Sequence, residues 1–208
     1  TEPFDYPLER LEVVDITAAN FHEHRTQIMD VGTEHYGSLT QRAPTTRRNG
    51  GQRLLQLPCD MLEATMSNAR AIGVALRDVV SGRFVAYPLG SALEDHDEEG
   101  VASDPCFGDN NTFYLHATAA RQSMQNHLAV ENLLLDVIRI RVLTAGFEYI
   151  SALIEERVQQ TGPQWLQQAR VIQAVDNYLR SGIRFVYLQL SSEKRQGPRV
   201  TIAADTAQ

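Results

Sequence analysis

Apolar and polar positions in the first half of the chain follow strand and helix periods in turn. A β-branched, apolar run over residues 11–16 predicts a strand, and Thr17 after it can cap a helix over 18–31. Residues 37–57 are turn-rich and basic, which predicts a long loop before a helix that starts at Pro58. Residues 71–93 hold two apolar segments joined by Ser81 and Gly82, a pattern that predicts an antiparallel hairpin.

The second half of the chain predicts a strand-helix-strand unit between two further segments. The acidic segment 94–111 predicts a solvated loop or lid. The unit itself is expected as a strand over 112–120, a helix over 127–145 that ends at Gly146, and a strand over 147–154. Its spacing indicates a parallel crossover. The last expected elements are a helix over 163–180 that stops at Gly182, a strand over 183–190 and a final strand over 199–204.

Together these elements predict an α/β (α+β) fold with a mixed, mostly antiparallel central sheet and flanking helices. A chain of 208 residues fits one domain over 1–208 better than two. The chain begins at Thr1 without a methionine, so it is either a processed chain or a piece of a longer protein.

The net charge narrows the class of partner. A formal charge of −7 argues against nucleic acid and anionic membranes, which are held by Lys and Arg surfaces. Neutral or cationic small molecules, or proteins, are the expected partners. Cys59 and Cys106 fit neither a zinc spacing nor a disulfide framework, which favours a reducing compartment, so we expect a cytoplasmic protein. The apolar runs are too short to span a membrane.

Residues 125–134 read QNHLAVENLL, a polar start that runs into the apolar face of a helix. Gly146 and Phe147 follow this helix, and the spacing Ala-x-x-x-Tyr-x-x-x-Gly occurs later at Ala174, Tyr178 and Gly182, followed by Ile183. In this order the motifs resemble the GCN5-related N-acetyltransferase (GNAT) superfamily over nearly the whole chain. The resemblance implies transfer of an acyl group, usually acetyl, from acetyl-CoA or another acyl thioester to a small-molecule or protein amine.

The resemblance also implies donor contacts around the loop that precedes the helix. They fall at Ala120, Gln125, Asn126, His127, Leu128, Ala129 and Val130. Leu128 and Val130 stand where the family has glycines, and their Cβ atoms predict poor access of a CoA pyrophosphate to the backbone amides. Two alternatives follow. The donor is a thioester without a nucleotide, such as one on an acyl carrier protein, or the fold is an inactive binding module whose donor slot these side chains fill.

Two residues are candidate catalytic groups. Tyr178 aligns with the family tyrosine that protonates the leaving thiolate, and a phenol pKa near 10 suits this step. Its alternative is a helix tyrosine packed in the core. His116 lies mid-strand, where alternation places Tyr114, His116 and Thr118 on one face and residues 113, 115, 117 and 119 on the other. Its imidazole could deprotonate the amine, or it is a hydrogen-bonded histidine under a loop.

Acceptor contacts are expected at Tyr114, Thr118, His35 and Tyr36. The acidic run 94–99 could attract a cationic acceptor, although such runs are more commonly solvated loops. The sequence predicts no metal site, because Asp95, His96 and Asp97 have no second ligand cluster at a regular spacing.

Overall fold

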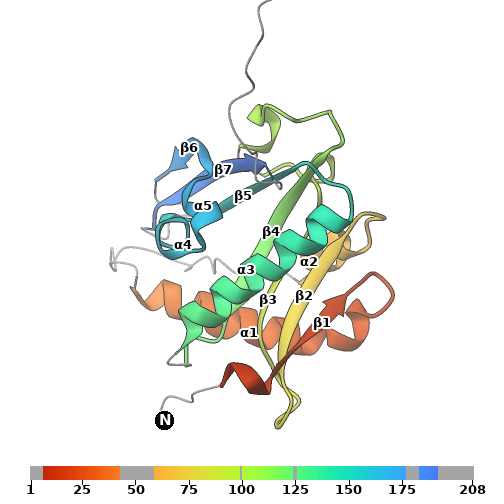
Figure 1. Cartoon of the computed structure of the whole chain (residues 1–208), viewed down its shortest axis with the longest axis vertical. Coiled ribbons are helices and arrows are strands. Elements are labelled where there is room, and N and C mark those ends of the chain that lie inside the picture. Colours follow the sequence, from red (N-terminus) through yellow and green to blue (C-terminus); the bar gives the residue numbers. More distant parts are fainter. Residues whose placement is uncertain (1–6, 43–58, 99, 124–125, 177–182, 192–208) are drawn as a thin grey trace, which may run out of the picture.

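A seven-stranded sheet forms the centre of the computed structural model, which describes residues 7–42, 59–98, 100–123, 126–176 and 183–191, with only the backbone given for 37–42 (Figure 1). The strands lie in the order β1-β2-β3-β4-β5-β7-β6. Their bounds are β1 (Leu11–Ile16), β2 (Ile72–Asp78), β3 (Phe84–Ala92), β4 (Thr112–Ala120), β5 (Tyr149–Glu155), β6 (Arg170–Val175) and β7 (Phe185–Ser191). Among the strands of the described residues, only β4 and β5 pair in parallel. The predicted mixed sheet with one crossover is confirmed.

Helices cover both faces of this sheet. Their bounds are α1 (Phe21–Arg42), α2 (Cys59–Met66), α3 (His127–Thr144), α4 (Glu156–Thr161) and α5 (Gln164–Gln167). The crossover helix α3 lies across β2, β3 and β4 (Figure 1), while α1 and α2 contact the sheet through β3 and β4. Their buried side chains form a separate cluster from those of α3, so the sheet divides two hydrophobic cores.

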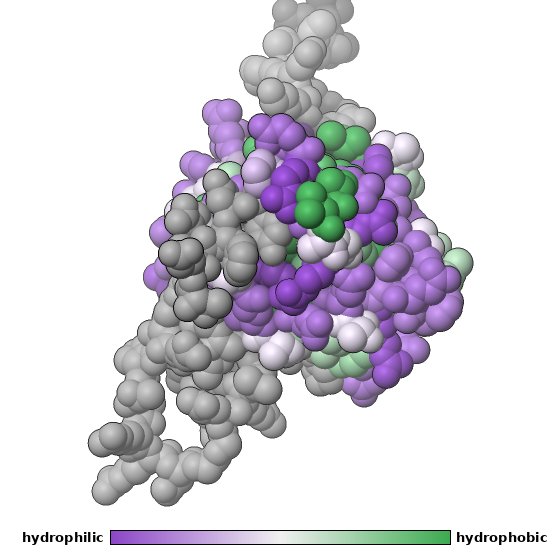
Figure 2. Space-filling model, turned by 90° about the horizontal axis from the view of Figure 1, so that it is seen from below, coloured by the Kyte–Doolittle hydropathy of each residue, from purple (hydrophilic) through white to green (hydrophobic). Residues whose placement is uncertain are grey.

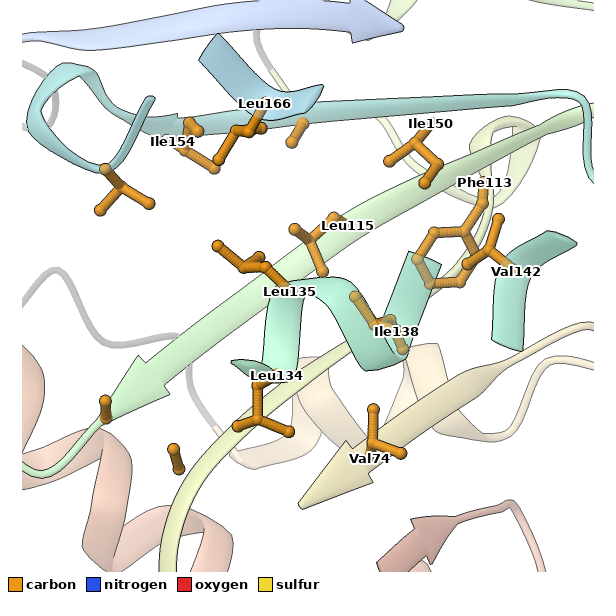
Figure 3. Close-up of a cluster of buried hydrophobic side chains, with 14 of the residues drawn as sticks. Val74, Phe113, Leu115, Leu134, Leu135, Ile138, Val142, Ile150, Ile154 and Leu166 are labelled. Atoms are coloured by element: carbon orange, nitrogen blue, oxygen red, sulfur yellow. The ribbon is translucent and has the colours of Figure 1, made fainter. Parts of the chain in front are cut away.

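The core under α3 explains why this segment is a helix. Its buried apolar residues recur at helical spacing, and they are Val130, Leu134, Leu135, Ile138 and Val142. Figure 3 shows Leu135, Ile138 and Val142 on the side of the helix near Phe113 and Leu115 of β4, and Ile150 of β5 belongs to the same cluster. Gly146, at φ 85°, then ends the helix in the left-handed conformation that glycine adopts without a Cβ clash.

A β-bulge interrupts β4 at His116. Leu89 of β3 pairs with Ala117 and the next residue, Gly90, pairs with Leu115, so His116 has no partner position on β3. Gly90 makes this close approach possible, because a Cβ there would lie 1.9 Å from the carbonyl oxygen of Tyr114.

The bulge reverses the side-chain alternation of β4. Phe113 and Leu115 point into the core under α3, whereas Ala117 and Ala119 belong to the core under α1 and α2. The prediction that these four residues share one face is therefore wrong beyond Leu115. A bulge adds one residue to one strand, and one residue is enough to invert a period of two.

Two boundaries of elements in the first half of the chain differ from the predicted ones. Helix α1 runs to Arg42 and so includes 37–42, which we predicted as loop. It begins at Phe21 rather than at residue 18, because Asn20 folds the preceding turn: its side chain accepts from the backbone N–H of Thr17 (2.7 Å) and donates to the carbonyl of Asp15 (3.0 Å). The rest of the predicted loop, residues 43–58, lies outside the described residues.

The predicted helix over 163–180 is wrong from residue 170 onward, as far as the structure describes it. Helix α5 ends at Gln167, and β6 then pairs antiparallel with β7. The β-branched side chains of Val171, Ile172 and Val175 favour a strand, and pairing with β7 satisfies the backbone there. Gln125, Tyr178, Gly182 and the predicted strand over 199–204 lie outside the described residues.

One face of the described surface is largely hydrophilic. Figure 2 shows one face on which hydrophilic residues dominate and hydrophobic ones gather in small, separate clusters. Within the described residues, no helix has both the length and the apolar character needed to cross a membrane.

Candidate functional site

A cleft opens where β4 and β5 separate. Their parallel pairing ends at Leu115 and Ala152, although β4 continues to Ala120 and β5 to Glu155. The separation begins at the His116 bulge. The resulting cleft has an empty volume of about 400 Å³, counting its mouth, which is open to solvent. Its walls include His35 and Tyr36 of α1, His116 and Thr118 of β4, Glu131 of α3 and Glu155 of β5.

Neither residue that replaces a loop glycine fills this cleft. Leu128 is 39% exposed and Val130 is fully buried in the core under α3. Both lie outside the cleft wall, to which α3 instead contributes Glu131. Neither side chain therefore closes the slot, which is the outcome that the binding-module alternative did not predict.

The other predicted loop contacts lie around the start of α3. Asn126 is the N-cap residue, His127 is the first helical residue, and Ala129 is exposed. Ala120 ends β4 with its side chain buried.

Helix α1 holds the free end of β4. The hydroxyl of Tyr36 donates to the carbonyl of Thr118 (2.9 Å), and the N–H of Ala120 donates to Nδ1 of His35 (3.2 Å). Three of the four predicted acceptor residues, His35, Tyr36 and Thr118, thus meet in one wall of the cleft. The fourth, Tyr114, is buried in another cluster with Leu93, Val101 and Tyr187 and does not line the cleft.

His116 lies in a polar network on the side of the sheet that carries α2. Its Nδ1 is 2.6 Å from Oγ1 of Thr65, and its Nε2 is 2.6 Å from Oε1 of Glu98. The second carboxylate oxygen, Oε2 of Glu98, lies 3.6 Å from Nδ1 of His96. Nε2 of His96 in turn lies 2.8 Å from Oγ of Ser91. Two imidazoles thus flank one carboxylate.

The segment that carries His96 and Glu98 is not simply a solvated acidic loop. The side chains of His96, Glu98 and His116 are only 3%, 15% and 5% exposed. Burial would raise the pKa of Glu98, but contacts with His116 and His96 outweigh it and hold that pKa far below its usual range. The prediction of a fully solvated run over 94–99 is therefore wrong at His96 and Glu98.

Asp104 anchors this segment to the sheet. Its buried carboxylate accepts hydrogen bonds from the hydroxyls of Ser151 (2.6 Å) and Tyr187 (2.8 Å) and from the amide of Gln189 (2.6 Å). Gly100, at φ 96°, packs so closely on Tyr187 that a Cβ there would lie 2.5 Å from the ring. These contacts fix the chain on the C-terminal side of Glu98.

Glu131 is a buried acid in the cleft wall. It is 3% exposed, and its Oε1 has no hydrogen-bond partner within the described structure. Burial raises the pKa of Glu131 to about 7, with Arg157 opposing this shift and Glu155 adding to it. A large fraction of Glu131 is therefore protonated at neutral pH, when its carboxyl group can donate a hydrogen bond.

The described lining of the cleft carries no lysine or arginine. Arg157, whose positive charge lowers the pKa of Glu131, lies 3.3 Å from Oε1 of Glu155. Arg121 at the end of β4 is engaged by the carbonyl of Phe84 (2.7 Å) and by Glu34 (2.8 Å). The cleft is thus lined by neutral and acidic groups.

Sequence reasoning missed Glu131 in the cleft wall and Glu98 beside His116. Glu131 had a signal, because it is a charged residue among the buried positions of α3, next to Val130 and one turn before Leu134 and Leu135. No pattern in the sequence indicates Glu98, since its contact with His116 joins a loop to a strand bulge. Tyr178 falls between β6 and β7 in the sequence, so the helix that placed it near the thioester is absent over 170–175.

Comparisons with known proteins identify the fold. No protein-family model matches the sequence, and no curated protein matches it. Solved structures do match over nearly their full length. A putative phosphinothricin N-acetyltransferase shares 10% identity at a TM-score of 0.59, covering 88% of this chain and 99% of that one. The aminoglycoside 6'-N-acetyltransferase from Enterococcus faecium shares 11% identity at a TM-score of 0.54, covering 89% of this chain and 99% of that one.

A third match was solved with a bound cofactor. It is yncA, a putative acetyltransferase from Salmonella typhimurium with its cofactor acetyl-CoA, at 12% identity and a TM-score of 0.50, covering 91% of this chain and 98% of that one. Such low identities establish the fold and leave the activity to the site. The chain therefore has the fold of the GNAT acetyltransferases.

Proposed function

We propose that this protein is an acyltransferase that moves an acyl group, most simply acetyl, from a thioester to an amine. The observation that carries the proposal is the open cleft between β4 and β5, which neither Leu128 nor Val130 fills. A degenerate module that had lost its donor would have no need to keep this slot open. The structure of yncA with acetyl-CoA supports an acyl thioester as the ligand class.

The donor that suits this cleft best is a thioester whose phosphates lie away from Glu131. The described wall has no cationic side chain to neutralise a pyrophosphate, and two of its groups are carboxyls, Glu131 and Glu155. In its neutral form Glu131 can donate a hydrogen bond to an amide carbonyl of a pantetheine arm. We therefore propose that acyl-phosphopantetheine, free or on a carrier protein, binds at least as well as acetyl-CoA.

In the proposed reaction the amine nitrogen attacks the thioester carbonyl and forms a C–N bond. The amine proton passes to the pair formed by His116 and Glu98, whose facing atoms, Nε2 and Oε1, lie 2.6 Å apart and can share it. The C–S bond then breaks, and the thiolate takes a proton from a general acid, which we assign to Tyr178 on its sequence spacing alone. Tyr36, His35 and Thr118 form the wall toward the acceptor.

Calorimetric titration tests the donor. Tag-free protein is titrated with acetyl-CoA, with acetyl-phosphopantetheine and with an acetylated carrier protein. We expect saturable binding of at least one of them and loss of that binding in Thr118→Trp, whose bulk would fill the cleft. Thr144→Trp, an exposed position on α3, is the matched control. Absence of binding by all three thioesters would refute the proposal.

Steady-state kinetics with a panel of amines tests the catalytic groups. We expect His116→Gln and Tyr178→Phe each to lower kcat by about 100-fold or more, with donor affinity nearly unchanged, because a proton-transfer group acts mainly in the transition state. An unchanged rate in either variant would remove that residue from the mechanism. An unchanged rate in both would leave the cleft as a binding site without the proposed chemistry.

A further inference from the structure

Three ligand-type side chains from two parts of the chain meet beside the cleft. His96 and Glu98 come from the segment after β3, and His116 comes from the bulge of β4. One ligand atom from each lies within 4.8 Å of the others. We propose that His96, Glu98 and His116 form a binding site for a divalent first-row transition-metal ion such as Zn²⁺.

The spacing of these atoms suits such an ion. With bond lengths near 2.1 Å, a tetrahedral ion holds its ligand atoms about 3.4 Å apart. Here Nε2 of His116 lies 2.6 Å from Oε1 of Glu98, and Nδ1 of His96 lies 3.6 Å from Oε2. These separations lie on either side of the ideal value, and the Glu98 side chain would have to move away from His116 by roughly 0.8 Å to reach it. Two imidazoles and one carboxylate also leave coordination positions for water or a ligand.

The imidazoles are held as metal-bound histidines usually are, through the ring nitrogen that faces away from the ion. Nδ1 of His116 contacts the hydroxyl of Thr65, and Nε2 of His96 contacts the hydroxyl of Ser91. When Thr65 donates its single hydroxyl proton to the carbonyl of Met61 (3.1 Å), its oxygen is left to accept from Nδ1–H of His116. In the neutral imidazole this tautomer leaves a lone pair on Nε2, directed at Glu98.

Two buried atoms at the centre of the cluster lack a hydrogen bond in the described structure. They are Nε2 of His116 and Oε2 of Glu98. Although Nε2 lies within ion-pair distance of Oε1, the contact does not have hydrogen-bond geometry. A lone pair facing a carboxylate in a buried site needs a cation to hold the two together. Either a proton or a metal ion can fill this role, and the second imidazole of His96 favours the metal.

The site is built before any ion arrives. Asp104 and Gly100 fix the chain after Glu98 against Tyr187, and β4 fixes His116. A rigid ligand set loses little conformational entropy on binding, which favours affinity. The sequence predicted no metal site at His96 because His116 comes from the β4 bulge, and the spacing in the sequence does not indicate that the two residues meet.

A metal ion here would compete with the proposed base. Both need the lone pair on Nε2 of His116, so the ion-loaded protein would not accept a proton at that atom. Turnover that depends on His116 should then fall when Zn²⁺ is added. This consequence rests on the proposed function, whereas the metal site itself does not.

Metal binding is measured directly on tag-free, chelator-treated protein. Titration with Co²⁺ should produce visible absorption typical of four- or five-coordinate nitrogen and oxygen ligation. This absorption should stop rising once one equivalent of Co²⁺ has been added. Titration with Zn²⁺ in a calorimeter should give the same stoichiometry. We expect His96→Gln and Glu98→Gln to weaken binding by about 100-fold or more, and Thr65→Val by about 10- to 100-fold, the effect of losing a group that orients a bound imidazole. His22→Gln, with a side chain 71% exposed, is the matched control and should change nothing.

X-ray absorption at the zinc edge keeps the proposal testable if a variant fails to fold. For the Zn²⁺-loaded wild-type protein we expect scattering from two imidazoles. No binding, binding that survives in His96→Gln and Glu98→Gln, or a spectrum with fewer than two imidazoles would overturn the proposal. None of these results depends on acyl transfer, so failure of the metal site and failure of the proposed function are distinguishable.

Discussion

Glu131→Gln is the substitution with the most specific expected effect. The wild-type carboxyl is buried, and its Oε1 lacks a partner within the described structure, so ionising it in place costs free energy. Glutamine has nearly the same shape and carries no charge at any pH. We therefore expect the variant to be more stable than the wild type wherever Glu131 is ionised, and about equally stable wherever Glu131 is protonated.

The magnitude and its pH window follow from the pKa of Glu131. Burial raises it from the ordinary value of 4.5 to about 7, so between these values the folded state binds more protons than the unfolded state. Stability contributed by this group therefore falls as the pH rises from about 4.5 to 7. At roughly 1.4 kcal/mol per pH unit, the penalty above pH 7 approaches about 3 kcal/mol, an upper limit that relaxation around the carboxylate would reduce.

Urea unfolding at pH 5 and pH 8 measures this effect. The quantity compared is the free energy of unfolding of Glu131→Gln minus that of the wild type, so that other titrating groups cancel. We expect this difference to be larger at pH 8 by about 1–3 kcal/mol. Glu9→Gln, at an exposed position, is the matched control and should show no such change. An equal difference at both pH values for Glu131→Gln would refute the reasoning.

Three further predictions concern the framework of the site. Asp104→Ala should lower the free energy of unfolding, measured in urea, by about 3 kcal/mol or more, because it leaves several buried donors without an acceptor. Asp109→Ala, at an exposed position, should change this free energy by less than about 0.5 kcal/mol. Gly90→Ala should lower the free energy of unfolding by at least about 1–3 kcal/mol, since the new Cβ would meet the β4 backbone. Faster amide exchange across β3 and β4 would report this loss. Leu134→Ala should cost about 2–5 kcal/mol in thermal unfolding, while the half-exposed neighbour Leu133→Ala should cost much less; equal costs would contradict the assigned face of α3.

The fold was largely predictable because its signals are local. The hairpin of β2 and β3, the strand-helix-strand unit of β4, α3 and β5, and the stop at Gly146 each rest on patterns within a few residues. The segment that forms β6 was mispredicted because pairing with β7, which is a distant contact, decided its structure.

The site was predictable only in outline. His116, His35, Tyr36 and Thr118 were expected near one another, and the cleft brings them together. The β4 bulge was not expected, because its cause is the register between β3 and β4 and the close packing of Gly90. Since the bulge inverts the alternation beyond His116 and marks the point where β4 separates from β5, the shape of the site depends on this one unpredicted residue shift.

Hydrogen exchange with and without a saturating acyl thioester tests most directly whether the slot between β4 and β5 is the donor site. We expect slower amide exchange in peptides that cover residues 115–120, 126–134 and 152–156, and little change in β1 or in the turn between β2 and β3. Unchanged exchange in all three segments, or protection confined to surfaces away from the cleft, would contradict the account.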